Sequence, residues 1–174
     1  KQTFIYLLGH KKVYGGVFFG IASISLIAYS HMSWFLEHMH RSFGVPVSDI
    51  TPSYGLINLV FGVAGTLCGA VLAKILTARG HSDAGLKTTL FFIVLMFLPY
   101  LASVLTQSLW WAYVWVAICT LCFNGYFGLA IASLQLSTPN QFRAQTSALL
   151  IFAANVSGLM LGPVIVGFLS DYVF

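Results

Sequence analysis

Five long stretches of the chain contain no Asp, Glu, Lys or Arg. The first runs for 24 residues over 13–36, and the others cover 51–73, 88–107, 109–142 and 144–170. A helix rises about 1.5 Å per residue, so roughly 20 residues match the ~30 Å hydrocarbon core of a bilayer. A charge at the centre of such a helix would cost about 2.5 to 3.5 kcal/mol. The pattern predicts transmembrane helices at about 13–36, 53–75, 88–107, 109–135 and 144–170.

The composition agrees with an all-α, polytopic membrane bundle. The chain is 59% apolar and 7% charged, with a mean hydropathy of +0.90, whereas a soluble domain carries about a quarter charged residues. The net charge of +4 is spread over short connections and is not gathered on one face. We therefore expect the lipid bilayer as a partner and no nucleic acid.

The basic residues predict the orientation. One side of the membrane has only Arg41, and the other has seven basic residues: Lys1, Lys11, Lys12, Lys74, Arg79, Lys87 and Arg143. Because Lys and Arg are retained in the cytoplasm, the N-terminus is predicted inside and the C-terminus outside. Trp34, Trp110 and Trp111 then fall on the outer side, as interfacial anchors or as fillers of helix contacts.

Two glycine pairs indicate an internal repeat. Gly65 and Gly69 lie in the second span, Gly158 and Gly162 lie 93 residues later in the fifth, and each pair lets a neighbouring backbone approach closely. The two spans cross the membrane in opposite directions, as in inverted repeats where spans one to three match spans four to six. A sixth span is expected downstream, and the chain is expected to be a piece of a longer protein.

Prolines and glycines predict breaks in the helices. Pro99 and Pro163 lie within spans three and five, where each removes a backbone hydrogen bond and should kink its helix. The connection between spans one and two is predicted to extend from Glu37 to Pro52, with Gly44 inside it.

Several segments resemble the major facilitator superfamily. Trp34-Phe35-Leu36 with Arg41 and Gly44, then Tyr54-Gly55, then Gly69 and Leu72, are similar to its spans seven and eight. The segment 134–171 resembles the spinster-like branch more narrowly. The residues that carry this likeness are Pro139, Arg143, Ala144, Ser147, Ala148, Asn155, Gly158, Gly162, Pro163, Gly167, Ser170 and Asp171.

The resemblance implies spans seven to eleven of a twelve-span secondary transporter in a bacterial inner membrane. Its partners would be an N-terminal six-helix half and a small-molecule substrate, moved by alternating access. The spinster-like branch suggests an amphiphile such as a lysolipid, while other superfamily members carry sugars, organic acids and drugs. One position departs from the family: Ala73, before Lys74, stands where the cytoplasmic motif has an acidic residue. A non-transporting membrane scaffold or assembly subunit is the other hypothesis.

A polar stripe marks the candidate substrate pathway. In span four, Thr120, Asn124 and Gln135 fall at helical spacing with Gly128 and Ile131. Polar groups avoid lipid, so the stripe either lines a cavity or makes hydrogen bonds between helices.

Three further polar residues lie inside spans. Asn155 stands beside the Gly158 and Gly162 pair, which favours packing over substrate contact, and Asn58 is open to both roles. An imidazole ordinarily titrates near neutrality, so His31 could relay protons, or it could simply be in contact with water on the outer side.

No enzyme, cofactor or metal site is predicted. His38 and His40 lie two residues apart and point to different sides of a helix. Cys119 and Cys122 form a lone CxxC inside a span, which indicates two small apolar side chains.

Arg143 is predicted to lie in the first turn of span five, because Pro139 disfavours helix at Thr138. A cation there opposes the helix dipole and needs another partner. Arg143, with Lys74 and Arg79, is a candidate for a cytoplasmic gate, and simple topology anchoring is the alternative for Arg143.

Overall fold

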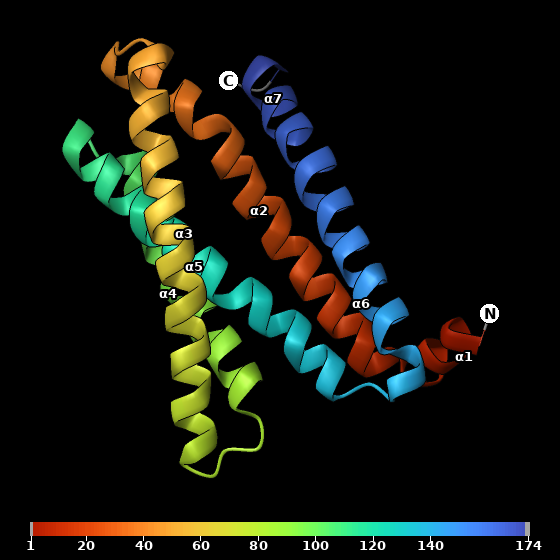
Figure 1. The fold of residues 1–174 in the computed structure, drawn as a ribbon. Coiled ribbons are helices and arrows are strands. Elements are labelled where there is room, and N and C mark those ends of the chain that lie inside the picture. Colours follow the sequence, from red (N-terminus) through yellow and green to blue (C-terminus); the bar gives the residue numbers. More distant parts are fainter. Residues whose placement is uncertain (1, 173–174) are drawn as a thin grey trace. The chain divides into compact units, whose positions relative to one another are not determined.

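The computed structural model describes residues 2–172 and contains only helices and their connections over that range (Figure 1). Lys1 lies outside the described residues, as does the side chain of Asp171. In chain order the helices are α1 (Gln2–Gly9), α2 (Lys11–Phe43), α3 (Val47–Ala78), α4 (Ala84–Leu105), α5 (Leu109–Leu136), α6 (Asn140–Asn155), the π-helix η1 (Val156–Leu161) and α7 (Gly162–Tyr172). Five helical segments are long and apolar enough to cross a membrane: α2, α3, α4, α5 and the continuous run Asn140–Ser170.

The helices extend beyond the charge-free stretches. The connection expected from Glu37 to Pro52 is only the three residues from Gly44 to Pro46, because α2 continues to Phe43 and α3 begins at Val47. Pro52 lies inside α3, near its N-terminus, where a proline removes only one backbone hydrogen bond. Helix α1 covers a segment for which the sequence pattern predicted no element.

Two glycines end helices in the left-handed conformation. Gly44, at φ 66°, follows α2, and Gly80, at φ 87°, follows α3. After α3 the amides of Gly80 and His81 donate to the carbonyls of Thr77 and Leu76, which satisfies two groups that the helix end leaves open. A side chain at either glycine would be strained.

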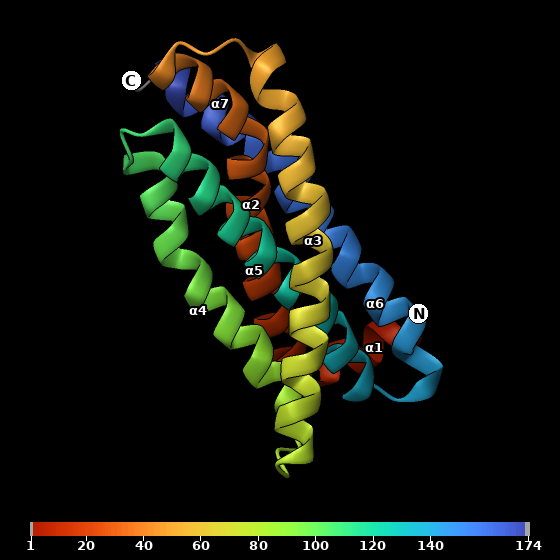
Figure 2. The same cartoon turned by 60° about the vertical axis from the view of Figure 1, so that its left-hand side comes forward.

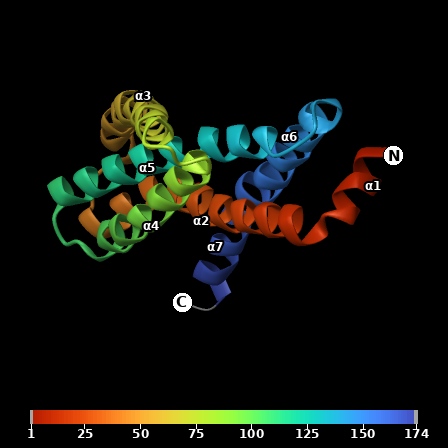
Figure 3. The same cartoon turned by 90° about the horizontal axis from the view of Figure 1, so that it is seen from below.

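The chain forms two compact units, and α2 and α5 contribute residues to both. The terminal unit comprises residues 1–34 and 134–174, and the central unit comprises residues 35–133. In the described part of the terminal unit, α2 runs parallel to α6, η1 and α7 (Figure 1). Helix α1 turns away from the axis of α2 towards α6 (Figure 3).

The central unit packs α3, α4 and α5 side by side with the end of α2 (Figure 2). Its buried core includes Phe35 and Tyr54, whose rings stack with centroids 5.2 Å apart. Met39, Ile50 and Val116 complete the apolar centre. Large apolar side chains on the outside, such as those of α4, remain exposed, as expected for helices that face lipid.

The two glycine pairs make equivalent contacts in the two units. A Cβ added at Gly65 would overlap the carbonyl oxygen of Leu121 on α5, and one added at Gly69 would lie 2.5 Å from that of Gly125. A Cβ at Gly158 would lie 2.9 Å from the carbonyl oxygen of Ser25 on α2, where it would also overlap the ring of Tyr29.

Each glycine pair therefore brings its helix against the backbone of one neighbour. Span two packs against span four in the central unit, and span five packs against span one in the terminal unit. In the inverted repeat, span two corresponds to span five and span four corresponds to span one. The glycine pairs therefore make corresponding helix contacts in both halves of the repeat.

The π-helix η1 ends at Leu161, two residues before Pro163. A proline has no amide hydrogen and crowds the carbonyl four residues before it, and a widened turn relieves that conflict. The indole nitrogen of Trp34 donates to the Pro163 carbonyl at 3.2 Å, so Trp34 fills a helix contact. Trp110 and Trp111 are 72% and 52% exposed at the start of α5.

Candidate functional site

The polar stripe of α5 meets α3 in the central unit. The buried hydroxyl of Thr120 donates to the side-chain oxygen of Asn58 at 3.5 Å. The Asn58 amide donates to the Tyr54 carbonyl at 2.9 Å, and the Asn124 amide donates to the Thr120 carbonyl at 2.9 Å. A Cβ at Gly62 would lie 3.5 Å from the Asn124 amide nitrogen.

Part of the polar stripe therefore serves helix packing. Thr120 and Asn58 bridge α5 and α3, as hydrogen bonds between membrane helices commonly do. Asn124 binds its own helix and lies against Gly62, and its side chain is half-buried. A half-buried amide retains hydrogen-bonding capacity for water or a solute.

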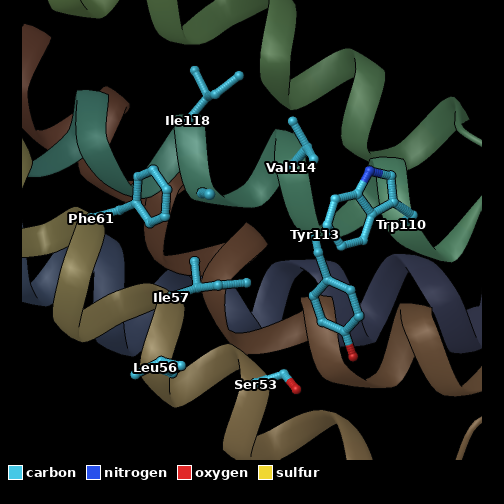
Figure 4. A pocket seen from close by; sticks show the side chains of 9 residues that line it. Ser53, Leu56, Ile57, Phe61, Trp110, Tyr113, Val114 and Ile118 are labelled. Carbon is cyan, nitrogen blue, oxygen red and sulfur yellow. The ribbon is translucent and has the colours of Figure 1, made fainter.

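A groove of about 520 Å³ lies beside this bridge, between α3 and α5 (Figure 4). Its wall is mainly apolar and aromatic, with Phe61, Trp110 and Ile118 among the lining residues. Ser53 and Tyr113 add hydroxyl groups to this wall (Figure 4). The groove was not predicted from the sequence, because its residues are apolar positions like those that face lipid.

The remaining pathway candidates belong to the terminal unit. Gln135 is exposed near the end of α5, whereas Asn155 and His31 are half-buried. Asn155 directly precedes η1, and its side chain makes no capping hydrogen bond to that helix. The structure thus brings Asn58, Thr120 and Asn124 together in the central unit. The other three candidates are not part of this cluster.

Arg143 lies in the first turn of α6, as expected from Pro139, which precedes the helix with ψ 143°. The Arg143 Nε donates to the Thr138 carbonyl at 2.8 Å, in the connection between α5 and α6. This bond uses one of the five guanidinium donors and leaves the outer nitrogens available to another partner.

The buried Thr138 also anchors a contact from α2. Its hydroxyl donates to the Leu134 carbonyl at 2.7 Å and lies 3.1 Å from the hydroxyl of Tyr14. Tyr14 was not singled out from the sequence, because a tyrosine near the start of a span is usually an interfacial anchor. Its burial against Thr138 depends on the tertiary structure.

Lys74 and Arg79 are exposed at the end of α3, with Arg79 as its C-terminal cap. The connection to α4 carries its own acidic residue, since Asp83 pairs with Lys87 at 3.0 Å. This hydrogen bond holds the pKa of Asp83 below its usual range. A depressed carboxyl pKa means that the pair is complete at neutral pH and is lost as the pH falls through that pKa.

The histidines and cysteines form no metal site within the described residues. His38 Nδ1 lies 3.3 Å from the Ser42 hydroxyl, and His40 Nδ1 lies 2.9 Å from the Val45 carbonyl. Cys119 and Cys122 are buried free thiols. These contacts are those of ordinary packing and helix capping.

No protein-family model and none of the curated proteins matches the chain. Two solved structures of a bacterial homologue of the human lysosomal transporter Spinster share its fold. The inward-facing, unoccupied form has a TM-score of 0.78 at 23% identity, and the match covers 98% of this chain and 35% of the transporter chain. The inward-facing, occupied form has a TM-score of 0.73 at 24% identity, and the match covers 90% of this chain and 34% of the transporter chain.

These likenesses confirm the predicted fold class and the resemblance at the level of the fold. The chain has the helical fold of these two transporter structures. It spans about a third of the length of the two transporter structures that it matches.

Proposed function

We propose that the chain is part of the C-terminal half of a spinster-like secondary transporter, which moves a small organic or lipid-like solute by alternating access. The observation that carries this proposal is the fold shared with a transporter over 98% of the chain. The five apolar helices support a place in the membrane, and the length of the matched transporters supports a second, N-terminal helical half as partner.

The substrate pathway would involve the face of α5 that carries Asn124 and Gln135. The half-buried Asn124 retains hydrogen-bonding capacity, and Gln135 is exposed within a helix that is apolar enough to cross the membrane. A glutamine at such a position requires protein or water as a neighbour rather than hydrocarbon. Asn58 and Thr120 would hold the pathway wall together rather than bind the solute.

A cysteine at Gln135 tests this function in the full-length protein. We expect Gln135→Cys to react with a membrane-impermeant thiol reagent, and we expect a transported solute to change the rate. Leu136→Cys is the matched control, because Leu136 is also exposed but points about 100° away on the helix. Cys68, Cys119 and Cys122 are first replaced.

The panel of solutes would contain lysolipids and organic anions, tested by labelling and by uptake. A non-transporting scaffold is the competing function, and it predicts that Gln135→Cys is inert or that no solute alters its reactivity. Uptake together with solute-dependent labelling at Gln135→Cys alone supports the transporter.

Arg143 is proposed to stabilise the closed cytoplasmic side, with Lys74 and Arg79 as further gate residues. Its bond to the Thr138 carbonyl supports this, because it fixes the guanidinium at the connection between α5 and α6. Lysine keeps the charge but loses the planar fork. We expect Arg143→Lys to lower the uptake rate several-fold while membrane insertion stays unchanged. If Arg143→Lys transports at the wild-type rate, the gating role is wrong and Arg143 serves only to anchor the topology.

A further inference from the structure

A second apolar groove, of about 290 Å³, lies in the terminal unit at the junction of α1 and α2. Its lining includes Phe4 and Leu8 of α1, Gly15 and Phe18 of α2, and Leu149 of α6. Among the described residues, Lys11 is the only charged one in its wall.

The groove follows a regular stripe along the chain. Residues 11, 15 and 18 are spaced by four and three positions and share one face of α2, and residues 4 and 8 share one face of α1. Gly15 stands in the middle, and a Cβ added there would meet no heavy atom within 4 Å. The absence of a side chain at Gly15 is therefore what hollows the stripe into a groove.

The groove changes character along its length. Phe4 and Leu8 are each 62% exposed, which is unusual for large apolar side chains beside water and ordinary beside lipid. Lys11 begins the first membrane-spanning helix, and Phe18 follows it by seven residues, or about 10 Å of helix rise. Lys11 thus places a cation at the membrane boundary, and the apolar groove extends from it towards the hydrocarbon core.

We propose that this groove binds one anionic phospholipid, with the headgroup phosphate at Lys11 and part of an acyl chain along Gly15 and Phe18. The charge complementarity selects an anionic lipid, and the neighbouring Lys12 adds to the local positive potential without lining the groove. The inference rests on the proposed function only in requiring that the chain spans a membrane.

Lipid titration of the purified full-length protein, followed by native mass spectrometry, tests this site independently of transport. The probes are palmitoyl-oleoyl phosphatidylglycerol and phosphatidylcholine. We expect the first phosphatidylglycerol to bind at least five-fold more tightly than phosphatidylcholine, and Lys11→Gln to remove that preference. Gly15→Leu should reduce binding of both lipids at this site by filling the groove.

Two matched variants control for general effects. Lys12→Gln removes the same charge outside the groove, and Gly16→Leu adds the same side chain at another glycine with open surroundings. Equal effects of Lys11→Gln and Lys12→Gln, or equal binding of the two lipids to the wild type, would overturn the proposal. So would unchanged lipid binding together with loss of thermal stability in Gly15→Leu, because protein would then cover the groove. If Gly15→Leu does not fold, the lysine pair decides.

Discussion

At the scale of single residues, the glycines of the two repeats show how little room separates the helices. Gly65 and Gly69 face carbonyl oxygens of α5, which belong to the backbone and cannot turn aside as a side chain can. Membrane helices gain their contact area from such close approach, since hydrophobic driving force is absent in lipid. Gly128 on α5, by contrast, has open surroundings.

Gly65→Ala is therefore expected to destabilise the protein. Overpacking costs about 1 to 3 kcal/mol, and the overlap with the Leu121 carbonyl outweighs the roughly 1 kcal/mol that alanine gains over glycine in a helix. Thermal unfolding in detergent measures the effect. Gly128→Ala is the control and should leave the midpoint unchanged or raise it; an equal loss in both variants would contradict the packing argument.

The sequence identified these glycines but could not identify their partners. A small-residue pair announces close packing, whereas the choice of Leu121 or Ser25 as the contacted residue depends on which helices become neighbours. The same holds for Asn58 and Thr120: the sequence left a cavity wall and a helix bridge open, and the side-chain hydrogen bond supports the bridge. Polar type alone does not distinguish the two.

At the scale of elements, the five spans were predictable because a charge within lipid is costly, which leaves a clear gap in the charge pattern. Helix α1 was not predictable in the same way, since it has only eight residues and isolated helices of that length are marginal. Contacts within the terminal unit stabilise it: Tyr6 stacks on Phe142 with centroids 4.9 Å apart, and Thr3 is hydrogen-bonded to Gln145.

Tyr6→Ala should release α1 from α6. Tyr6 supplies both the stack on Phe142 and a hydroxyl 3.3 Å from that of Tyr14, so its loss removes two contacts. Hydrogen exchange of the full-length protein should rise at least ten-fold in residues 2–9 and stay unchanged in α3. Ile5→Ala is the control, because Ile5 is exposed and points about 100° away from Tyr6 on α1. Equal protection in both variants would show that Tyr6 does not hold the helix.

At the scale of the whole molecule, the helix directions within each unit agree with the predicted crossing pattern. The contacts of Gly158, Gly162 and Gly167 fall on successively later residues of α2, so spans one and five run parallel. Gly65 and Gly69 contact successively later residues of α5, so spans two and four also run parallel. A chain that crosses the membrane back and forth requires two spans to be parallel when an odd number of spans lies between them. Three spans lie between spans one and five, and one lies between spans two and four.

The basic residues predict the direction of insertion, and labelling at opposite ends of α3 tests this prediction. Lys74, Arg79 and Lys87 flank the α3–α4 connection, which contains the exposed Ser82, and Ser48 is exposed at the other end of α3. Because basic connections stay in the cytoplasm, an impermeant thiol reagent should label Ser48→Cys in right-side-out vesicles and Ser82→Cys in inside-out vesicles. Both variants carry Cys68→Ser, since Cys68 is exposed. The opposite pattern would place the N-terminus outside, and labelling of both cysteines in sealed vesicles of one orientation would contradict a membrane-spanning α3.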